Sequence, residues 1–107
     1  MSTFDDRERG FETKYARDED MAFRVTARRN KLLGHWAAGL MQLTPEETSS
    51  YATAVVQAEF EEAGDEDVVR KLLGDLQAAN VDIDEAAVRQ ALHDKDVEAR
   101  RQLMELK

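Results

Sequence analysis

Apolar residues recur at helical spacing in four successive stretches of this sequence, and no stretch alternates apolar and polar residues as a surface strand does. The stretches span about 20–43, begin at 44 and 65, and begin again after 84. Each is apolar on one side only, so each needs neighbours to cover that side. The pattern therefore predicts an all-α protein, a four-helix bundle with short connections between antiparallel neighbours. The predicted core residues are Val25, Leu32, Leu33, Trp36, Leu40, Leu43, Tyr51, Ala52, Val55, Val56, Phe60, Val69, Leu72, Leu73, Leu76, Ala79, Val88, Ala91, Leu92, Ala99, Leu103 and Leu106.

The predicted helix ends carry residues that suit them. In the sequence LTPEE, Thr44 and Glu47 have the spacing of a capping box, and Pro45 takes the first helical position. A short side chain that accepts hydrogen bonds favours an N-cap, whereas glycine or asparagine favours a left-handed C-terminal stop. The remaining predicted end residues are Asp65 and Asp84 as N-caps, and Gly64 and Asn80 as stops.

Residues 1–19 differ from the helical body that follows them. Acids and bases are mixed along this arm, and its aromatic residues are Phe4, Phe11 and Tyr15. On a helix these three would lie within about 40° of one another, but Gly10 lowers the helix propensity and an isolated helix of this length is marginal in water. We therefore predict a flexible N-terminal arm at 1–19 and a four-helix bundle at 20–107. The arm can extend the first helix when a partner covers its rings.

The charge balance excludes several classes of function. The net charge is −8, and residues 32–107 hold sixteen acids and seven bases, whereas residues 1–31 hold seven acids and eight bases. An acidic body argues against a nucleic-acid partner. No apolar run approaches the roughly 20 residues of a membrane span, and no signal peptide is recognisable. With no cysteine in the chain, we expect a cytoplasmic protein that neither binds nucleic acid nor inserts into a membrane.

The sequence also lacks the motifs of catalysis. His35 and His93 form no zinc-binding pattern, and the two acidic clusters near residues 65–67 and 82–85 lack the glycine and terminal glutamate of a calcium loop. No phosphate-binding loop is present. We therefore expect no enzyme activity, no cofactor and no metal site.

A short basic run on the first predicted helix has two interpretations. Arg24, Arg28, Arg29 and Lys31 follow one another with no acid between them. They could bind a phosphate or nucleotide, which would make the protein an anion-binding regulatory module. They could equally bind carboxylates of a partner or of the protein's own acidic helices.

Three blocks of the sequence resemble a known family. FDDRERGFETKYARDED at 4–20, RRNKLLGHWAAGLM at 28–41 and FEEAGDEDVVRKLLGDL at 60–76 resemble the zeta subunit, the natural inhibitor of the F-type ATP synthase in alphaproteobacteria. The blocks have the order and separation of that family, and the similarity is weakest after about Asp84.

The resemblance implies an inhibitor of ATP hydrolysis that is peripheral to the inner membrane through the ATP synthase. Its partner would be the catalytic head, with its alpha, beta and central-stalk subunits. The arm would insert as a helix between an alpha and a beta subunit and block rotation in the hydrolytic direction. The resemblance assigns this inhibitory segment to Phe4, Asp5, Asp6, Arg7, Glu8, Arg9, Phe11 and Tyr15.

Overall fold

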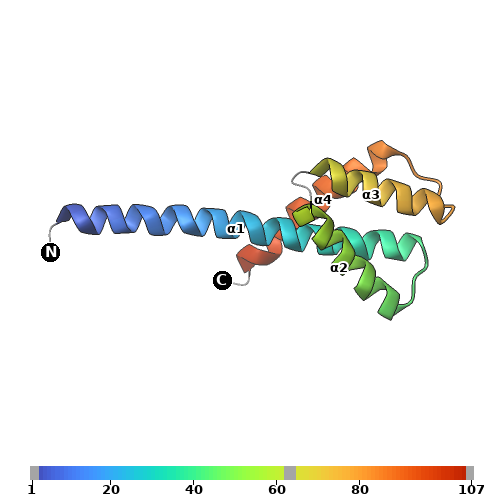
Figure 1. The fold of residues 1–107 in the computed structure, drawn as a ribbon, viewed down its shortest axis with the longest axis horizontal. Coiled ribbons are helices and arrows are strands. Elements are labelled where there is room, and N and C mark those ends of the chain that lie inside the picture. Colours follow the sequence, from blue (N-terminus) through green and yellow to red (C-terminus); the bar gives the residue numbers. More distant parts are fainter. Residues whose placement is uncertain (1–2, 62–64, 106–107) are drawn as a thin grey trace.

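The fold is entirely helical in the computed structural model, which describes residues 3–61 and 65–105, with side chains described for 20–59 and 65–104. Figure 1 shows α1, α2, α3 and α4 in chain order. Their bounds are Thr3–Leu40, Pro45–Glu61, Asp65–Ala78 and Glu85–Glu105. No strand occurs in the described ranges. The predicted all-α class and the four predicted helices are confirmed.

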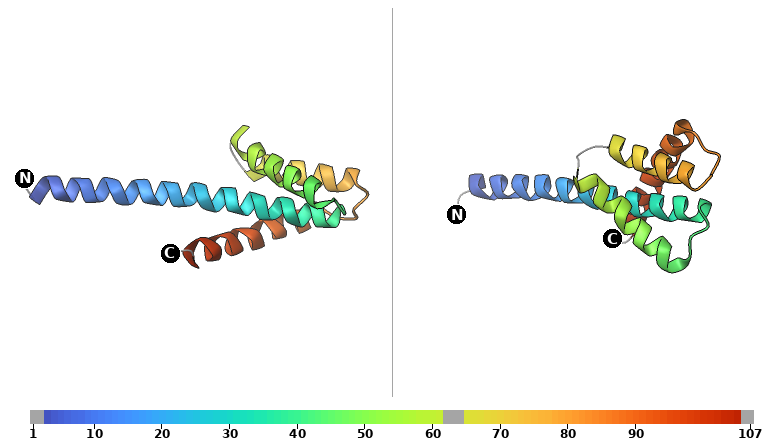
Figure 2. Two further views of the ribbon diagram at one scale, coloured as in Figure 1. Left: turned by 90° about the horizontal axis from the view of Figure 1, so that it is seen from below. Right: turned by 45° about the vertical axis from the view of Figure 1, so that its right-hand side comes forward.

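The helix α1 combines the arm with the centre of the bundle. Its C-terminal part packs against all three other helices, whereas its N-terminal part projects away from them in every view (Figures 1 and 2). The molecule is therefore elongated, with extents of 64 × 25 × 21 Å. A projecting single helix gains nothing from tertiary packing, which agrees with a flexible arm.

The start predicted for this helix is wrong. The sequence suggested a beginning near Asp20, but α1 begins at Thr3, because no proline interrupts the arm and its residues continue the helix of the packed part. The predicted end at Leu43 is also too late. Gln42 adopts a φ of 59°, and its amide and that of Leu43 donate to the carbonyls of Gly39 and Ala38 at 3.2 and 3.0 Å, which closes the helix.

The other predicted caps account for most of the helix ends. The Glu47 amide donates to the Thr44 hydroxyl at 3.2 Å, and the Thr44 amide donates to the Glu47 carboxylate at 2.9 Å, so the capping box is confirmed. The Ala87 amide donates to Asp84 at 2.9 Å. Asn80 ends α3 with a φ of 64°. The carboxylate predicted as the cap of α3, that of Asp65, instead accepts a hydrogen bond from a buried arginine, and Gly64 lies outside the described residues.

The core lies where α1 crosses the other three helices. Most of its fully buried side chains were predicted, among them Leu33, Val55, Leu72, Leu76 and Val88. The predicted side chains of Phe60 and Leu106 lie outside the described ones.

Two predicted core residues, Leu40 and Ala79, are exposed instead. The buried positions at the end of α1 are taken by Ala37 and Ala38, whose small side chains let the helices approach closely. Val68 was not predicted but is fully buried, because α3 contacts α1, α2 and α4 and so needs a wider apolar face than one stripe.

Candidate functional site

The arm carries every residue that the family resemblance assigned to an inhibitory segment. Positions 4–9, 11 and 15 all lie in the projecting part of α1, which is drawn in blue in Figure 1. The structure thus brings these positions together on one helix at one end of the molecule. Their side chains lie outside the described ones, so the role of each residue stays a prediction.

The basic run does not form one cluster. Arg24 is exposed and pairs with Asp20 at 3.1 Å within α1. Arg28 donates to the Gln102 side chain of α4 at 3.1 Å. Lys31 is exposed and borders a shallow groove between α1 and α2 with His35. The fourth member of the run points into the protein. Anion binding by these residues stays a prediction, and the structure does not gather them around a common point.

Arg29 is the buried member of the run and is only 5% exposed. Its guanidinium Nη2 lies 2.9 Å from an Asp65 oxygen and 3.6 Å from a Glu59 oxygen, and its Nη1 lies 3.9 Å from Asp96. Its Nε donates to Asn30 Oδ1 at 3.1 Å. These partners come from α1 to α4, so one side chain connects all four helices near the base of the arm. Arg29 thus binds carboxylates of the protein's own helices, as one of the two interpretations of the basic run predicted.

The carboxyl of Glu59 in this cluster is electrostatically strained. Burial raises its pKa, and the opposing charge of Arg29 is partly offset by the nearby charge of Asp65. Glu59 Oε2 and Asn30 Nδ2 are buried without a hydrogen-bond partner among the described residues. A buried carboxylate with an unpaired oxygen is less stable than its neutral form.

We expect Glu59→Gln to change how stability depends on pH. Because the folded-state pKa of Glu59 is raised, its stabilising contribution is full at acid pH and is lost as the pH rises through the folded-state pKa. Glutamine stays neutral, so the variant should gain free energy of unfolding relative to wild type as the pH rises from about 4.5, the ordinary glutamate value, to 7. Urea unfolding at both pH values measures this difference.

Glu66→Gln is the matched control for that measurement. Arg89 holds the pKa of the Glu66 carboxyl below its ordinary value through two hydrogen bonds of 2.9 and 2.7 Å. The free energy of unfolding of Glu66→Gln relative to wild type should therefore fall, rather than rise, as the pH increases. If the free energies of unfolding of Glu59→Gln and wild type differ by the same amount at both pH values, burial does not raise the pKa of Glu59.

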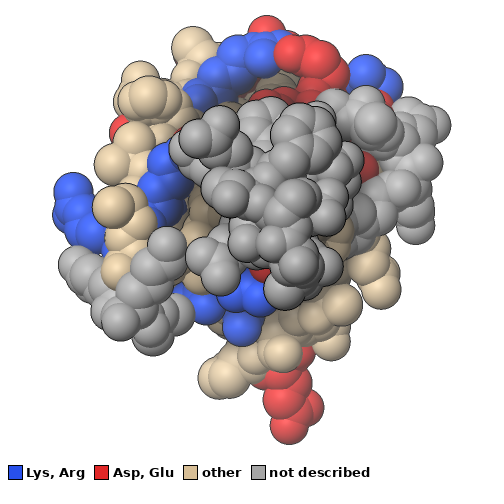
Figure 3. Space-filling model, turned by 90° about the vertical axis from the view of Figure 1, so that its left-hand side faces the viewer, with Lys and Arg blue, Asp and Glu red and all other residues tan. Residues whose placement is uncertain are grey.

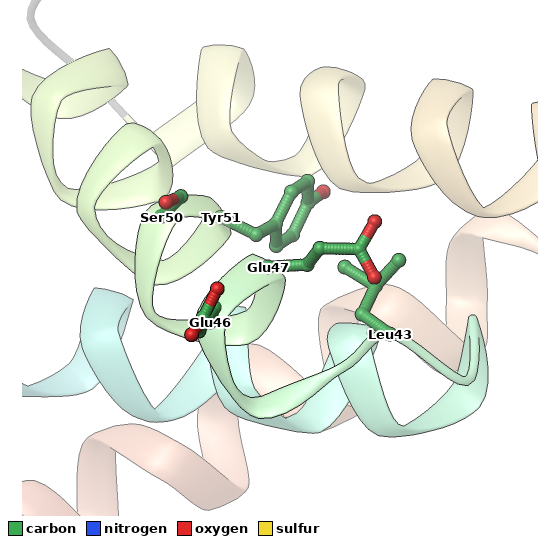
Figure 4. A pocket seen from close by; sticks show the side chains of 5 residues that line it. All are labelled: Leu43, Glu46, Glu47, Ser50 and Tyr51. Atoms are coloured by element: carbon green, nitrogen blue, oxygen red, sulfur yellow. The ribbon is translucent and has the colours of Figure 1, made fainter.

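A second polar cluster lies at the other end of the bundle. The Tyr51 hydroxyl donates to Asp75 at 2.7 Å, and Lys71 donates to the same oxygen at 3.0 Å while lying 5.2 Å from the Tyr51 ring centre. Burial and the Asp75 carboxylate raise the pKa of Tyr51. Figure 4 shows Tyr51 beside Leu43 and Glu47 in a surface hollow at the start of α2. A tyrosine that is this hard to ionise serves as a hydrogen-bond donor between α2 and α3.

One histidine of the chain lies on α1 and the other on α4. His35 and His93 are exposed. Within the described ranges, no three histidine or acidic side chains are grouped so that they could hold a metal ion. None of the helices in the described ranges combines the length and the hydropathy of a membrane-spanning segment.

Sequence reasoning missed two features near the base of the arm. Arg29 appeared as one of four equivalent cations, and the only hint of its burial is that it is followed by Asn30, another polar residue that is fully buried. Gly34 received no role, yet a Cβ there would lie 2.5 Å from the Ala52 Cα. Neither feature can be seen before α1 is placed against the other helices.

Comparisons with known proteins show a similar fold and the family of this chain. A search of curated proteins found no match. A protein solved by solution NMR is 45% identical, with 81% of this chain and 99% of that chain covered and a TM-score of 0.71. The family described as ATPase inhibitor subunit zeta matches residues 1–102, which include the whole arm. The chain therefore belongs to the ATPase inhibitor subunit zeta family.

Proposed function

We propose that this protein inhibits ATP hydrolysis by the F-type ATP synthase by inserting its arm, residues 1–19, as a helix between an alpha and a beta subunit of the catalytic head. The arm reaches toward the central stalk and hinders rotation in the hydrolytic direction. Residues 20–107 form the body that stays outside. Family membership supports the inhibitory role, and the resemblance described above suggests the mode of insertion.

The observation that carries the proposal is the projection of α1 beyond the bundle (Figure 1). A single helix is about 10–12 Å wide with its side chains and fits between two subunits. The whole molecule measures 25 × 21 Å across its long axis, so the bundle is too wide to follow. The arm binds one rotational state of the head better than the next, which shifts the population of states without any chemistry of its own.

The test is ATP hydrolysis by the catalytic head, titrated with full-length protein and with a Phe4→Ala/Phe11→Ala variant. Buried aromatic anchors carry a large share of binding energy, so we expect inhibition to weaken by about 30-fold. The melting temperature should not change, because these positions lie on the projecting part of α1. A version without residues 1–19 should not inhibit.

The control is Leu40→Ala, which removes an exposed apolar side chain at the other end of α1 and should inhibit as wild type does. A large fall in melting temperature for the double variant would mean that the arm belongs to the core. Full inhibition by the version without residues 1–19 would refute the proposal.

A further inference from the structure

The helix α4 has a second face that the bundle does not use. Val97, Arg100, Arg101 and Met104 follow one another at the spacing of one helical face and together line a shallow surface hollow. Val97 is 44% and Met104 71% exposed, although both side chains are large and apolar. We call these four residues the outer face of α4. Single exposed apolar residues are common, but two that flank a pair of arginines on one face are typical of a contact surface.

The charges of the outer face are available to a partner. The Arg100 Nε lies 2.9 Å from Asp96, yet the Arg100 side chain is 64% exposed. Arg101 is exposed and forms no ion pair with the described residues. The outer face is thus a basic and apolar area on a body whose residues 32–107 carry sixteen acids against seven bases.

The part of α4 that carries the outer face lies beside α1 near the base of the arm. The hydrogen bond from Arg28 to Gln102 connects α1 to the C-terminal part of α4, between Arg101 and Met104 in the sequence. Figure 2 shows this part of α4 running along α1 toward the arm. Figure 3 looks along the arm and shows Lys and Arg side chains on several sides of its base.

We propose that the outer face of α4 is a second docking surface, which binds an acidic surface with an apolar side chain at the mouth of the cleft that receives the arm. This inference rests on the proposed function. Because the bundle is wider than a helix, it stops where the arm enters. The hydrogen bond between Arg28 and Gln102 keeps the C-terminal part of α4, which carries the outer face, beside α1 near that entrance. An acidic rim complements Arg100 and Arg101, whereas it would repel most of the rest of the body.

The arginines and the apolar residues have separable effects. Exposed charges at the rim of an interface mainly govern the association rate and are screened by salt. An apolar side chain that becomes buried mainly slows dissociation. The outer face should therefore speed the encounter through Arg101 and prolong the complex through Met104.

The experiment measures binding and dissociation rates of full-length protein on the catalytic head of the ATP synthase, together with ATP hydrolysis. We expect Arg101→Glu to slow association about tenfold at low salt, with the difference disappearing at high salt. Met104→Ala should speed dissociation by roughly fivefold. The matched controls are Arg70→Glu, an arginine on α3 whose side chain is 75% exposed, and Leu40→Ala. Both should bind as wild type does.

The outcomes separate this inference from the proposed function. If wild type inhibits hydrolysis and both outer-face variants bind like their controls, the outer face is not a docking surface and the inference is overturned. If wild type binds with rates that depend on Arg101 and Met104 but does not inhibit, the outer face docks and the inhibitory role fails. If wild type does not bind the head at all, both proposals are overturned.

Discussion

Replacing Arg29 with alanine should destabilise the bundle by roughly 3 kcal/mol at neutral pH, the lower end of the range for removing one partner of a buried ion pair. The Arg29 side chain is 6% exposed, and its guanidinium lies near three carboxylates. Its loss leaves the buried Glu59 without an ion-pair partner among the described residues. Asp65 is half-exposed, so water compensates part of the loss and the upper end of the range is not reached. Urea unfolding followed by circular dichroism measures the change.

Arg28→Ala is the control, because it removes a neighbouring arginine that makes a single half-buried hydrogen bond and should cost about 1 kcal/mol. The loss of free energy of unfolding in Arg29→Ala should be smaller at acid pH, since protonation removes the repulsion among the remaining carboxylates. If the two arginine variants are equally stable, Arg29 does not hold the four helices together.

Gly34→Ala should also destabilise, by about 2 kcal/mol, even though alanine is the better helix former. The new Cβ would lie 2.5 Å from the Ala52 Cα and 3.0 Å from the Ala52 Cβ. Because the obstacle includes backbone, α1 and α2 would have to move apart, and overpacking of this kind costs about 1–3 kcal/mol. The same unfolding experiment gives the value.

Gly39→Ala, in the same helix, provides a control of opposite sign. Nothing lies within 4 Å of a Cβ at that position, so the gain in helix propensity should appear as about 0.5–1 kcal/mol of added stability. Stabilisation by both substitutions would mean that α1 and α2 separate readily at Gly34.

The helices themselves were predictable, because their signals are local. Thr44 and Glu47 lie three residues apart, and the capping box they predict depends on no other part of the chain. Asp84 is a similar case. Gln42 is the exception, because glutamine seldom adopts a positive φ and no local signal predicts that α1 ends two residues before it.

Long-range contacts could not be predicted in the same way. Leu40 and Leu33 fit the same apolar stripe, yet Leu33 is fully buried and Leu40 is 43% exposed, because only the contact with other helices distinguishes them. Arg29 and Arg28 are adjacent cations, and only the fold places Glu59, Asp65 and Asp96 around the first of them. The arm was identified from its composition and its family resemblance, whereas the outer face of α4 depends on how α4 lies against α1.

The continuity of α1 from arm to bundle has a further thermodynamic consequence. Starting a helix in a free peptide is unfavourable by a factor of about 1,000, or roughly 4 kcal/mol, because several residues must be fixed before the first hydrogen bond forms. In this protein the packed part of α1 is already helical, so the arm needs only to propagate from an existing end. Each further residue then adds one hydrogen bond for one residue fixed, with Gly10 as the weakest step. The bundle thereby lowers the entropic cost of ordering the arm in any cleft, an effect that requires no contact between the bundle and the partner.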